Sequence, residues 1–338
     1  MTTLVTGAAG FLGSHVTRQL VARGEEVRVL MRASSSNRAI SDLPLEYVTG
    51  DLRDPASLER AMKGVKRVFH VAADYRLWAR KSQEIYDSNV GGTKNLLAAA
   101  KRAGLEQLIY TSTVATIAVD RPELPNESTY AKLEEMVGHY KRSKWMAERE
   151  ALQAAKEGLP VIVAMPTTPV GPWDWKPTPT GKIILDFLNG KMPGYIETGL
   201  NFVGVEECAA GHLLASDKGK VGERYLLGAE NLTLKELLDT LSNITGLAAP
   251  SMKIPHGLAL GVAYMETGFS RLLGKEPQIP VEGVKIARHK MFVDVSRAQR
   301  ELGFQPGSAA AALERAVRWY RANGYVKPRR AKKMRLAA

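Results

Sequence analysis

Short apolar runs alternate with amphipathic stretches over the first half of the chain. The apolar runs cover residues 3–6, 27–31, 47–49, 68–72, 107–111 and 161–165, and helical spacing covers residues 11–23, 55–63, 84–102 and 139–156. Strands that alternate with helices form a parallel sheet covered by helices on both faces. The pattern therefore predicts an α/β fold with a doubly wound parallel sheet within residues 1–166.

The pattern changes after residue 166. A segment rich in proline and tryptophan, residues 166–179, predicts mainly loop. Helical spacing returns at residues 205–217, 233–245, 257–273 and 308–323. We interpret residues 167–326 as a smaller, mixed C-terminal lobe that binds substrate, with some segments returning to the first domain. Residues 327–338 form a basic tail.

Composition narrows the class of protein. The 338 residues are 45% hydrophobic and 24% charged, which excludes a disordered or fibrous chain. The single cysteine, Cys208, forms no internal disulfide, which favours a reducing, cytoplasmic location. No apolar run approaches the roughly 20 residues that a membrane-spanning helix needs. The N-terminus also lacks the pattern of a signal peptide.

The net charge of +12 indicates a polyanionic partner or an anionic cofactor. Six basic residues and no acidic ones lie in residues 327–338, where a solvated, frayed end is expected. The alternative is peripheral contact with an anionic membrane, worth about 1 kcal/mol per basic residue. No zinc-ligand spacing, stacking motif or helix-turn-helix pattern occurs, so we expect neither a nucleic-acid partner nor a metal.

A glycine motif follows the first strand and opens a helix. Gly7 permits a tight turn, Gly10 lets the backbone approach a pyrophosphate, and Gly13 lets the helix pack closely on the sheet. The alternative is a tight turn without a ligand. The context of strand and helix favours a Rossmann-type dinucleotide site.

The residues at the end of the second strand indicate whether the dinucleotide is NAD or NADP. An NAD site has an acidic residue there, but this chain has Arg32, with Arg38 nearby. A guanidinium suits a 2′-phosphate, so we expect NADP(H) to be preferred, with NAD(H) as the alternative. Asp51 and Leu52 follow the third strand and could meet the adenine. Asp51 could also begin the helix at Pro55.

Tyr140 and Lys144 lie four residues apart on a predicted helix, and hence on one face. A nearby cation lowers the pKa of a tyrosine, which can then transfer a proton. The fifth strand ends with Thr111, Ser112 and Thr113, whose hydroxyl groups fall at the ligand-binding edge of the sheet. Together these features predict a proton-relay site.

In order along the chain, these motifs resemble the extended short-chain dehydrogenases/reductases. The resemblance rests on residues 7–13, 51–52, 70–73, Asn89 and the Tyr140-x-x-x-Lys144 pair. Residues 72–78, 140–144, 176–181 and 187–191 are most similar to the dihydroflavonol-4-reductase-like branch, and within it to the hopanoid-associated sugar epimerase family.

The resemblance implies roles for individual residues. Tyr140 would be the acid/base, and Lys144 would lower its pKa and hold the nicotinamide ribose. Thr113 matches the catalytic serine, with Ser112 as the fallback, and Asn89 would support the active-site helix and a water relay. The remaining cofactor contacts would be Ala9, Phe11, Leu12, Val71, Ala72, Ala73, Thr111, Pro166, Thr167 and Thr168.

The residues favour a reductase over an epimerase. Sugar-nucleotide epimerases of this type usually carry an acidic residue where this chain has Arg32, and an Arg-Tyr-Phe-Asn run where it has residues 164–169. Apolar side chains would line the substrate site, although core packing is their alternative: Tyr75, Leu77, Trp78, Trp173, Trp175 and Phe187.

We therefore expect NADPH-dependent reduction of an aldehyde or ketone to an alcohol, or the reverse oxidation, on a medium-sized, partly apolar substrate. A sugar or nucleotide-sugar epimerase of the hopanoid-associated type is the alternative, and a nucleotide sensor is a third. Residues 84–102 and 139–156 would pair in a homodimer. The apolar helix at 257–273 would be core, subunit interface or an entry for a lipid-like substrate.

Overall fold

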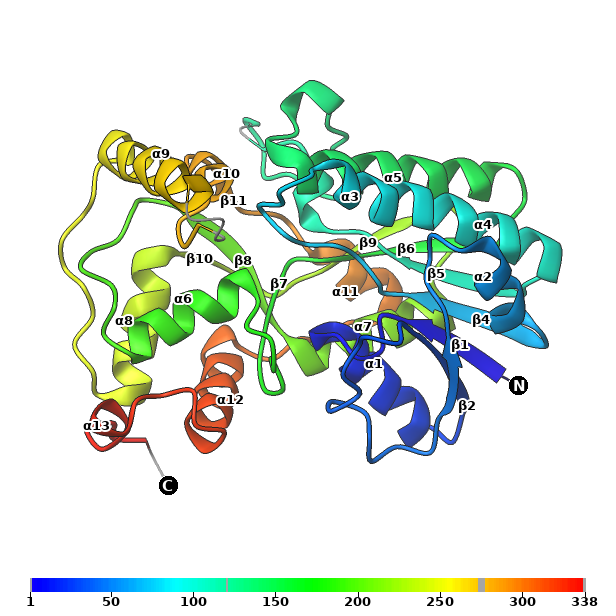
Figure 1. Ribbon diagram of the computed structural model, residues 1–338, viewed down its shortest axis with the longest axis horizontal. Coiled ribbons are helices and arrows are strands. Elements are labelled where there is room, and N and C mark those ends of the chain that lie inside the picture. The colour runs from blue at the N-terminus through cyan, green and yellow to red at the C-terminus, as the bar shows by residue number, and fades with distance from the viewer. Residues whose placement is uncertain (1, 120, 273–276, 337–338) are drawn as a thin grey trace.

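The computed structural model describes residues 2–119, 121–272 and 277–336. A large sheet with helices on both faces lies at one end of the molecule, and a smaller lobe lies at the other (Figure 1). The N-terminus belongs to the large sheet and the C-terminus to the smaller lobe.

The large sheet has seven strands in the order β3-β2-β1-β4-β5-β6-β9, and every neighbouring pair is parallel. The order reverses between β1 and β4, which is where doubly wound sheets bind ligands. The predicted fold class is therefore confirmed. The strands are β1 (Thr2–Thr6), β2 (Glu26–Met31), β3 (Glu46–Thr49), β4 (Val65–His70), β5 (Gln107–Thr111), β6 (Val161–Pro166) and β9 (Arg224–Leu227).

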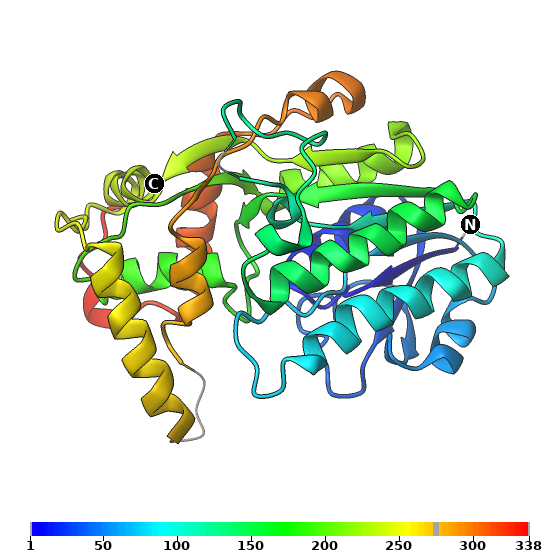
Figure 2. The same ribbon diagram turned by 90° about the horizontal axis from the view of Figure 1, so that it is seen from above.

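Two hydrophobic clusters join helices to the two faces of this sheet (Figure 2). One face carries α2 (Pro55–Met62), α4 (Gly92–Ala103) and α5 (Gly138–Lys156), and the other carries α1 (Phe11–Ala22), α7 (Val205–Lys218) and α11 (Ser296–Leu302). The helix predicted at 84–102 is interrupted. Its first turn is α3 (Gln83–Tyr86), and a π-helical turn (Asp87–Gly91) joins it to α4.

The smaller lobe is built on a mixed sheet in which β8 pairs parallel with β7 and β11 and antiparallel with β10. The segment 166–179 is thus not wholly loop, because it contains β7. The lobe comprises β7 (Thr168–Val170), α6 (Pro179–Leu188), β8 (Gly199–Gly204), β10 (Glu230–Thr233), α8 (Leu234–Thr245), α9 (His256–Leu272), α10 (Val281–Ile286), β11 (Lys290–Met291), α12 (Ala309–Ala322) and α13 (Pro328–Ala331).

Three elements that follow residue 166, namely α7, β9 and α11, pack on the large sheet rather than on the smaller lobe. They bring the second half of the chain back to the first. The predicted domain boundaries after residues 166 and 326 stay predictions.

The basic tail is docked on the smaller lobe. Arg330 donates to the carbonyl of Leu188 at 2.9 Å, and the backbone N–H of Arg335 donates to the carbonyl of Thr245 at 2.8 Å. Met334 is buried in the core of the lobe. The expectation of a frayed end is therefore wrong for residues 327–336, because Met334 anchors them; residues 337–338 lie outside the described residues. Membrane contact through this tail stays a prediction.

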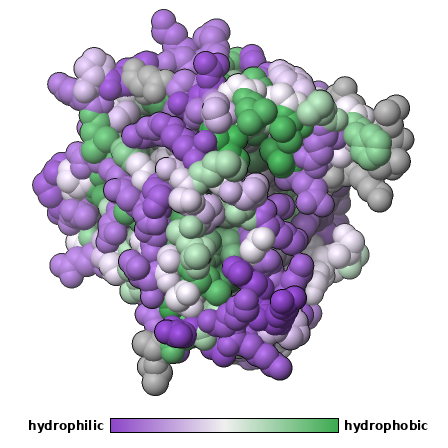
Figure 3. Space-filling view, turned by 90° about the vertical axis from the view of Figure 1, so that its left-hand side faces the viewer, coloured by the Kyte–Doolittle hydropathy of each residue, from purple (hydrophilic) through white to green (hydrophobic). Residues whose placement is uncertain are grey.

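Helix α9 exposes much of its apolar surface. Leu258, Met265 and Phe269 are 61%, 71% and 64% exposed, whereas Ala263 is buried. Figure 3 shows hydrophobic side chains gathered on the upper part of this end of the molecule, where α9 lies. The expectation of a core helix is thus wrong for these side chains, and Leu273 lies outside the described residues. None of the described helices is long and apolar enough to cross a membrane.

Candidate functional site

The glycine motif forms the turn between β1 and α1. Gly7 has φ of 73°, and a Cβ on it would lie 2.6 Å from the backbone nitrogen of Ala72. A Cβ on Gly13 would meet the carbonyl oxygen of Gly7 at 2.1 Å. Gly10 begins the helix without a side-chain cap, so backbone N–H groups of the first turn remain available to an anion. This cradle fits a pyrophosphate. Ala9, Phe11 and Leu12 belong to the same segment, and their cofactor contacts stay predictions.

Arg32 stands at the carboxyl end of β2. Its side chain is exposed, and within the described part of the chain it makes no hydrogen bond or ion pair. Arg38 behaves differently, because its guanidinium lies 3.6 Å from the centre of the Trp175 ring. Arg32 is therefore an exposed cation without a hydrogen-bond partner among the described residues, and its charge contributes to the lowered pKa of Asp51. Arg38, in contrast, is engaged by an aromatic face.

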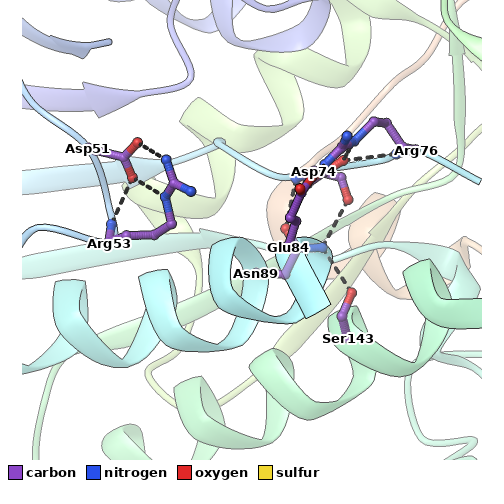
Figure 4. Close-up of polar contacts among 7 residues, drawn as sticks. All are labelled: Asp51, Arg53, Asp74, Arg76, Glu84, Asn89 and Ser143. Carbon is purple, nitrogen blue, oxygen red and sulfur yellow. Dashed lines mark hydrogen bonds and ion pairs between the residues drawn. The ribbon is translucent and has the colours of Figure 1, made fainter. Parts of the chain in front are cut away.

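Asp51 follows β3 and pairs with Arg53. The guanidinium of Arg53 binds both carboxylate oxygens, at 2.8 and 2.9 Å (Figure 4). This hydrogen bonding lowers the pKa of Asp51 below its usual value. The side chain of Asp54, not that of Asp51, caps α2 by accepting from Ala56 at 3.1 Å, so the alternative role of Asp51 belongs to Asp54. Leu52 packs beneath Gly92 at the start of α4.

Asn89 connects the loop after β4 to the active-site helix. It lies in the π-helical turn, accepts from the backbone N–H of Asp74 at 2.7 Å and donates to Ser143 at 2.9 Å (Figure 4). Ser143 in turn donates to the carbonyl of Tyr140 at 2.8 Å. Asn89 is therefore placed to support α5, and its predicted part in a water relay stays a prediction. Val71, Ala72 and Ala73 form the loop just before Asp74.

The side chains of Tyr140 and Thr113 lie close to each other. Thr113 is on the loop after β5 and Tyr140 is on the first turn of α5. Burial raises the pKa of Tyr140, and the nearby Thr113 hydroxyl acts in the opposite sense. Ser112, the fallback for Thr113, instead donates to the buried carboxylate of Glu148.

Lys144 lies one turn beyond Tyr140 and is 3% exposed. Its ammonium donates to the carbonyl of Thr111 at 2.7 Å and lies 3.2 Å from the hydroxyl of Tyr110. Burial lowers the pKa of Lys144 to about 8, an effect that Glu148 opposes. Burial has the largest effect on the pKa of Tyr140, and the lowering of this pKa by Lys144 stays a prediction.

A chain of buried polar groups beneath Lys144 was missed by the sequence reasoning. Thr6 and His70 are joined at 2.7 Å and His70 and Thr93 at 3.3 Å, and Thr93 lies close enough to Tyr110 to act on its pKa. Burial lowers the pKa of His70 to about 3, so its ring is neutral at physiological pH. A histidine at the end of an otherwise apolar strand was the available signal.

A second buried group, His212 of α7, approaches the same strand end. Its Nε2 lies 3.2 Å from the hydroxyl of Thr111, and its Nδ1 lies 2.8 Å from the carbonyl of Cys208. Because Nδ1 must donate to that carbonyl, Nε2 accepts from Thr111. The Thr111 hydroxyl is therefore engaged within the protein, while its carbonyl holds Lys144.

Glu148 and Arg224 form a buried ion pair behind Ser112. Each is 2% exposed, and Nη1 of Arg224 lies 3.0 Å from Oε1 of Glu148. Thr116 donates to the other carboxylate oxygen at 2.8 Å. The pair joins α5 to β9 and was also missed, although Glu148 lies four residues beyond Lys144 on the same face of the helix.

The side chains predicted to line the substrate site occupy different surroundings. Trp173 lies under the guanidinium of Arg18, 3.5 Å from the ring centre, and Trp175 packs against Arg38. Phe187 is buried in the core of the smaller lobe.

Tyr75, Leu77 and Trp78 lie on the loop after β4, and Leu77 approaches Gly283 of α10. Pro166, Thr167 and Thr168 are buried where β6 passes into β7. The substrate and nicotinamide contacts of all these residues stay predictions. Within the described residues, no cluster of histidine, cysteine or acidic side chains could hold a metal ion.

The large sheet has seven parallel strands, with the glycine turn at its switch point and the helix of Tyr140 and Lys144 at its carboxyl edge. These features define an NAD(P)-dependent enzyme of the extended short-chain dehydrogenase/reductase type. Residues 3–228 match the model of the NAD dependent epimerase/dehydratase family, and the chain belongs to that family.

Two curated relatives cover nearly the whole chain. The chain is 46% identical over 328 residues to a putative dihydroflavonol 4-reductase of Synechocystis sp., covering 96% of this chain and 95% of the relative. It is 37% identical over 328 residues to sterol demethylase protein B of Methylococcus capsulatus, covering 96% and 100%. The predicted resemblance to dihydroflavonol-4-reductase-like proteins is confirmed.

Among solved structures, a nucleoside-diphosphate-sugar epimerase from Pseudomonas aeruginosa superposes with a TM-score of 0.80 at 28% identity, covering 97% of this chain and 99% of that one. The family thus contains proteins named as reductases and proteins named as epimerases. The local site must distinguish the two activities.

Proposed function

We propose that the protein reduces a ketone or aldehyde to an alcohol with NADPH, or catalyses the reverse oxidation. The observation that carries the proposal is the placement of the Thr113 side chain beside Tyr140, close enough to act on its pKa, at the carboxyl edge of the sheet. A carbonyl oxygen bound between these two hydroxyl groups would meet two donors. Reduction of a carbonyl needs such a donor beside its oxygen.

The protonation state of Tyr140 favours the reductive direction. Burial raises its pKa, so the phenol keeps its proton at neutral pH and can donate it. The reverse oxidation would instead need the tyrosinate, which accepts the proton of the alcohol. The bound nicotinamide would supply the hydride, and Tyr140 would supply the proton.

NADP(H) is the preferred dinucleotide in this proposal. Arg32 is exposed and unpaired within the described residues, at the strand end that faces the adenosine ribose in this fold. A free guanidinium can bind a 2′-phosphate with two parallel hydrogen bonds. The open first turn of α1 would hold the pyrophosphate.

The reductase name of the Synechocystis relative also supports the proposal. A cytoplasmic homodimer belongs to the same proposal, with α4 and α5 at the interface. An open groove between these helices is lined by Tyr86, Val90 and Met146 among others, and Met146 is 36% exposed. Replacing Met146 with arginine should convert a dimer to a monomer in analytical ultracentrifugation; an unchanged mass would contradict this interface.

The test of the activity is NADPH oxidation against a panel of aldehydes and ketones, run beside a sugar-nucleotide epimerisation assay. Stoichiometric formation of an alcohol with loss of NADPH is expected. Epimerisation without net consumption of NADPH would instead support the epimerase and overturn the proposal.

A further inference from the structure

Lys141, next to Tyr140 on α5, is a buried cation whose hydrogen-bond partner is a poor acceptor. Its side chain is 8% exposed, and its ammonium lies 3.5 Å from the sulfur of Met291. A thioether is a weak hydrogen-bond acceptor. Among the described residues, no oxygen atom is hydrogen-bonded to this ammonium. Such a buried charge is costly unless an acceptor offsets it.

The nearby carboxylates are engaged elsewhere. Glu148 is paired with Arg224 at 3.0 Å. Glu282 of α10 accepts from the backbone N–H of His139 at 3.3 Å, at the first turn of α5. Burial alone accounts for the lowered pKa of Lys141, about 8, and no acidic group opposes it. Among residues 2–119, 121–272 and 277–336, no carboxylate therefore supplies a counter-charge to Lys141.

Lys144, about one turn further along the same helix, differs from Lys141 in its hydrogen-bond acceptors. It is also buried, but the Thr111 carbonyl and the Tyr110 hydroxyl accept from its ammonium. Of the two lysines, Lys141 is thus the one left without an oxygen acceptor.

Lys141 lies where the smaller lobe meets the active-site helix. Its partner Met291 is in β11, which pairs with β8. Tyr140, Leu200 and Ile286 pack against the same hydrophobic cluster as Met291. Helix α10 reaches the beginning of α5 from the smaller lobe (Figure 1). A substrate that places its carbonyl at Tyr140 would extend into this region.

We propose that Lys141 binds a carboxylate of the substrate and so selects oxo acids over neutral ketones of the same shape. The proposal rests on the proposed reductase function. One ammonium in apolar surroundings balances one negative charge, whereas a phosphate dianion would leave a second charge buried without a partner. Lys141 is a residue that determines specificity, and Tyr140 remains the proton donor.

The test uses one variant and a matched pair of substrates. Lys141→Met keeps the length and apolar character of the side chain and removes only its charge. With NADPH, wild-type enzyme should show a kcat/KM at least about 10-fold higher for 3-oxodecanoate than for its methyl ester. The variant should lose about 10- to 100-fold in kcat/KM for the acid, mainly through KM, and change little for the ester.

Lys156→Met, at the exposed end of α5, is the control and should leave both substrates unaffected. A thermal transition of Lys141→Met no lower than that of the wild type would establish that the variant folds. An equal loss for the acid and the ester, or no preference for the acid in the wild type, would overturn the proposal.

Direct binding separates failure of this inference from failure of the reductase proposal. If no ketone is reduced, the affinities for decanoate and 1-decanol are measured by tryptophan fluorescence. Wild-type protein should bind decanoate more tightly than decanol, and Lys141→Met should lose that preference. Equal binding of decanoate by both proteins would overturn the role of Lys141 whatever the reaction is.

Discussion

The Thr113 side chain lies beside the hydroxyl of Tyr140 and acts on its pKa, while the neighbouring Ser112 hydroxyl donates to Glu148. Successive residues of an extended segment point to opposite sides, and Thr113 has extended backbone angles. The two adjacent hydroxyl groups therefore have separate tasks. Thr113 meets the proton donor, and Ser112 belongs to the buried pair of Glu148 and Arg224.

Removing the Thr113 hydroxyl should lower kcat while leaving Ser112 intact. Thr113→Val should reduce kcat by about 10- to 100-fold, because one charge-stabilising donor at the substrate oxygen is lost. Thr113→Ser should keep most of the activity. Ser112→Ala is the matched control. It should lower the thermal transition, since Glu148 loses a donor, but change kcat by less than Thr113→Val. The reverse ranking of the two variants would contradict the assignment.

Tyr140→Phe should abolish turnover and leave the cofactor site intact. Loss of the proton donor should reduce kcat by about 10²- to 10⁴-fold. NADPH binding, measured by its fluorescence, should stay close to that of the wild type, because the glycine turn and Arg32 are distant in sequence and unaltered. Near-normal turnover in this variant would remove Tyr140 from the reaction.

Arg32→Ala should reduce the preference for NADPH. The KM for NADPH should rise by about 10- to 100-fold as a charged hydrogen-bonding partner is lost, and the KM for NADH should hardly change. Arg23→Ala is the control, because Arg23 is exposed and pairs with Asp217 at the far end of α1. A parallel rise for both cofactors would mean that Arg32 does not read the 2′-phosphate.

Lys141→Met should also alter the pH dependence of stability. Burial lowers the pKa of Lys141 from 10.5 to about 8 in the folded protein. Between these values the unfolded chain binds more protons, so the contribution of Lys141 to stability rises with pH across that window. Below about pH 8 the lysine is charged in both states, and burying its charge lowers the free energy of unfolding by on the order of 3 kcal/mol. Removing the charge should therefore stabilise the protein near neutral pH.

This gain should shrink as the pH rises from about 8 to 10.5, because the folded-state lysine is then neutral and the buried charge is gone. Urea unfolding of both proteins near pH 7 and near pH 10, without cofactor, measures the difference. Other titrating groups cancel in this comparison because both proteins contain them. A stability difference that is the same at both pH values would contradict the buried, charged state of Lys141.

The large sheet could be predicted because parallel strands buried on both faces are continuous apolar runs. Strand β9 could not be predicted, because Arg224 interrupts its pattern. That arginine is buried against distant partners, namely Glu148, 76 residues away, and the carbonyl of Glu127. The docked tail was missed for a similar reason. The burial of Met334 depends on a surface that α6 and α8 complete only in the folded protein.

The candidate site also contains residues that the sequence could predict and residues that it could not. Gly7, Tyr140 and Lys144 could be predicted, because they belong to local motifs whose spacing indicates their chemistry. The polar groups that hold Lys144 could not be predicted from the sequence, because Tyr110 and Thr93 come together only through tertiary contacts. The surroundings of Trp173 were equally hidden, since Arg18 comes from a distant helix.

The central claim is that hydride from NADPH and a proton from Tyr140 are both transferred to a carbonyl. The most direct measurement uses NADPH in which both hydrogens at C4 of the nicotinamide are deuterium, with a ketone substrate, followed by mass spectrometry of the product. The account predicts an alcohol that carries one deuterium on the former carbonyl carbon, and no such product from Tyr140→Phe. A product without deuterium, or an epimerised sugar formed with NADPH unchanged, would contradict it.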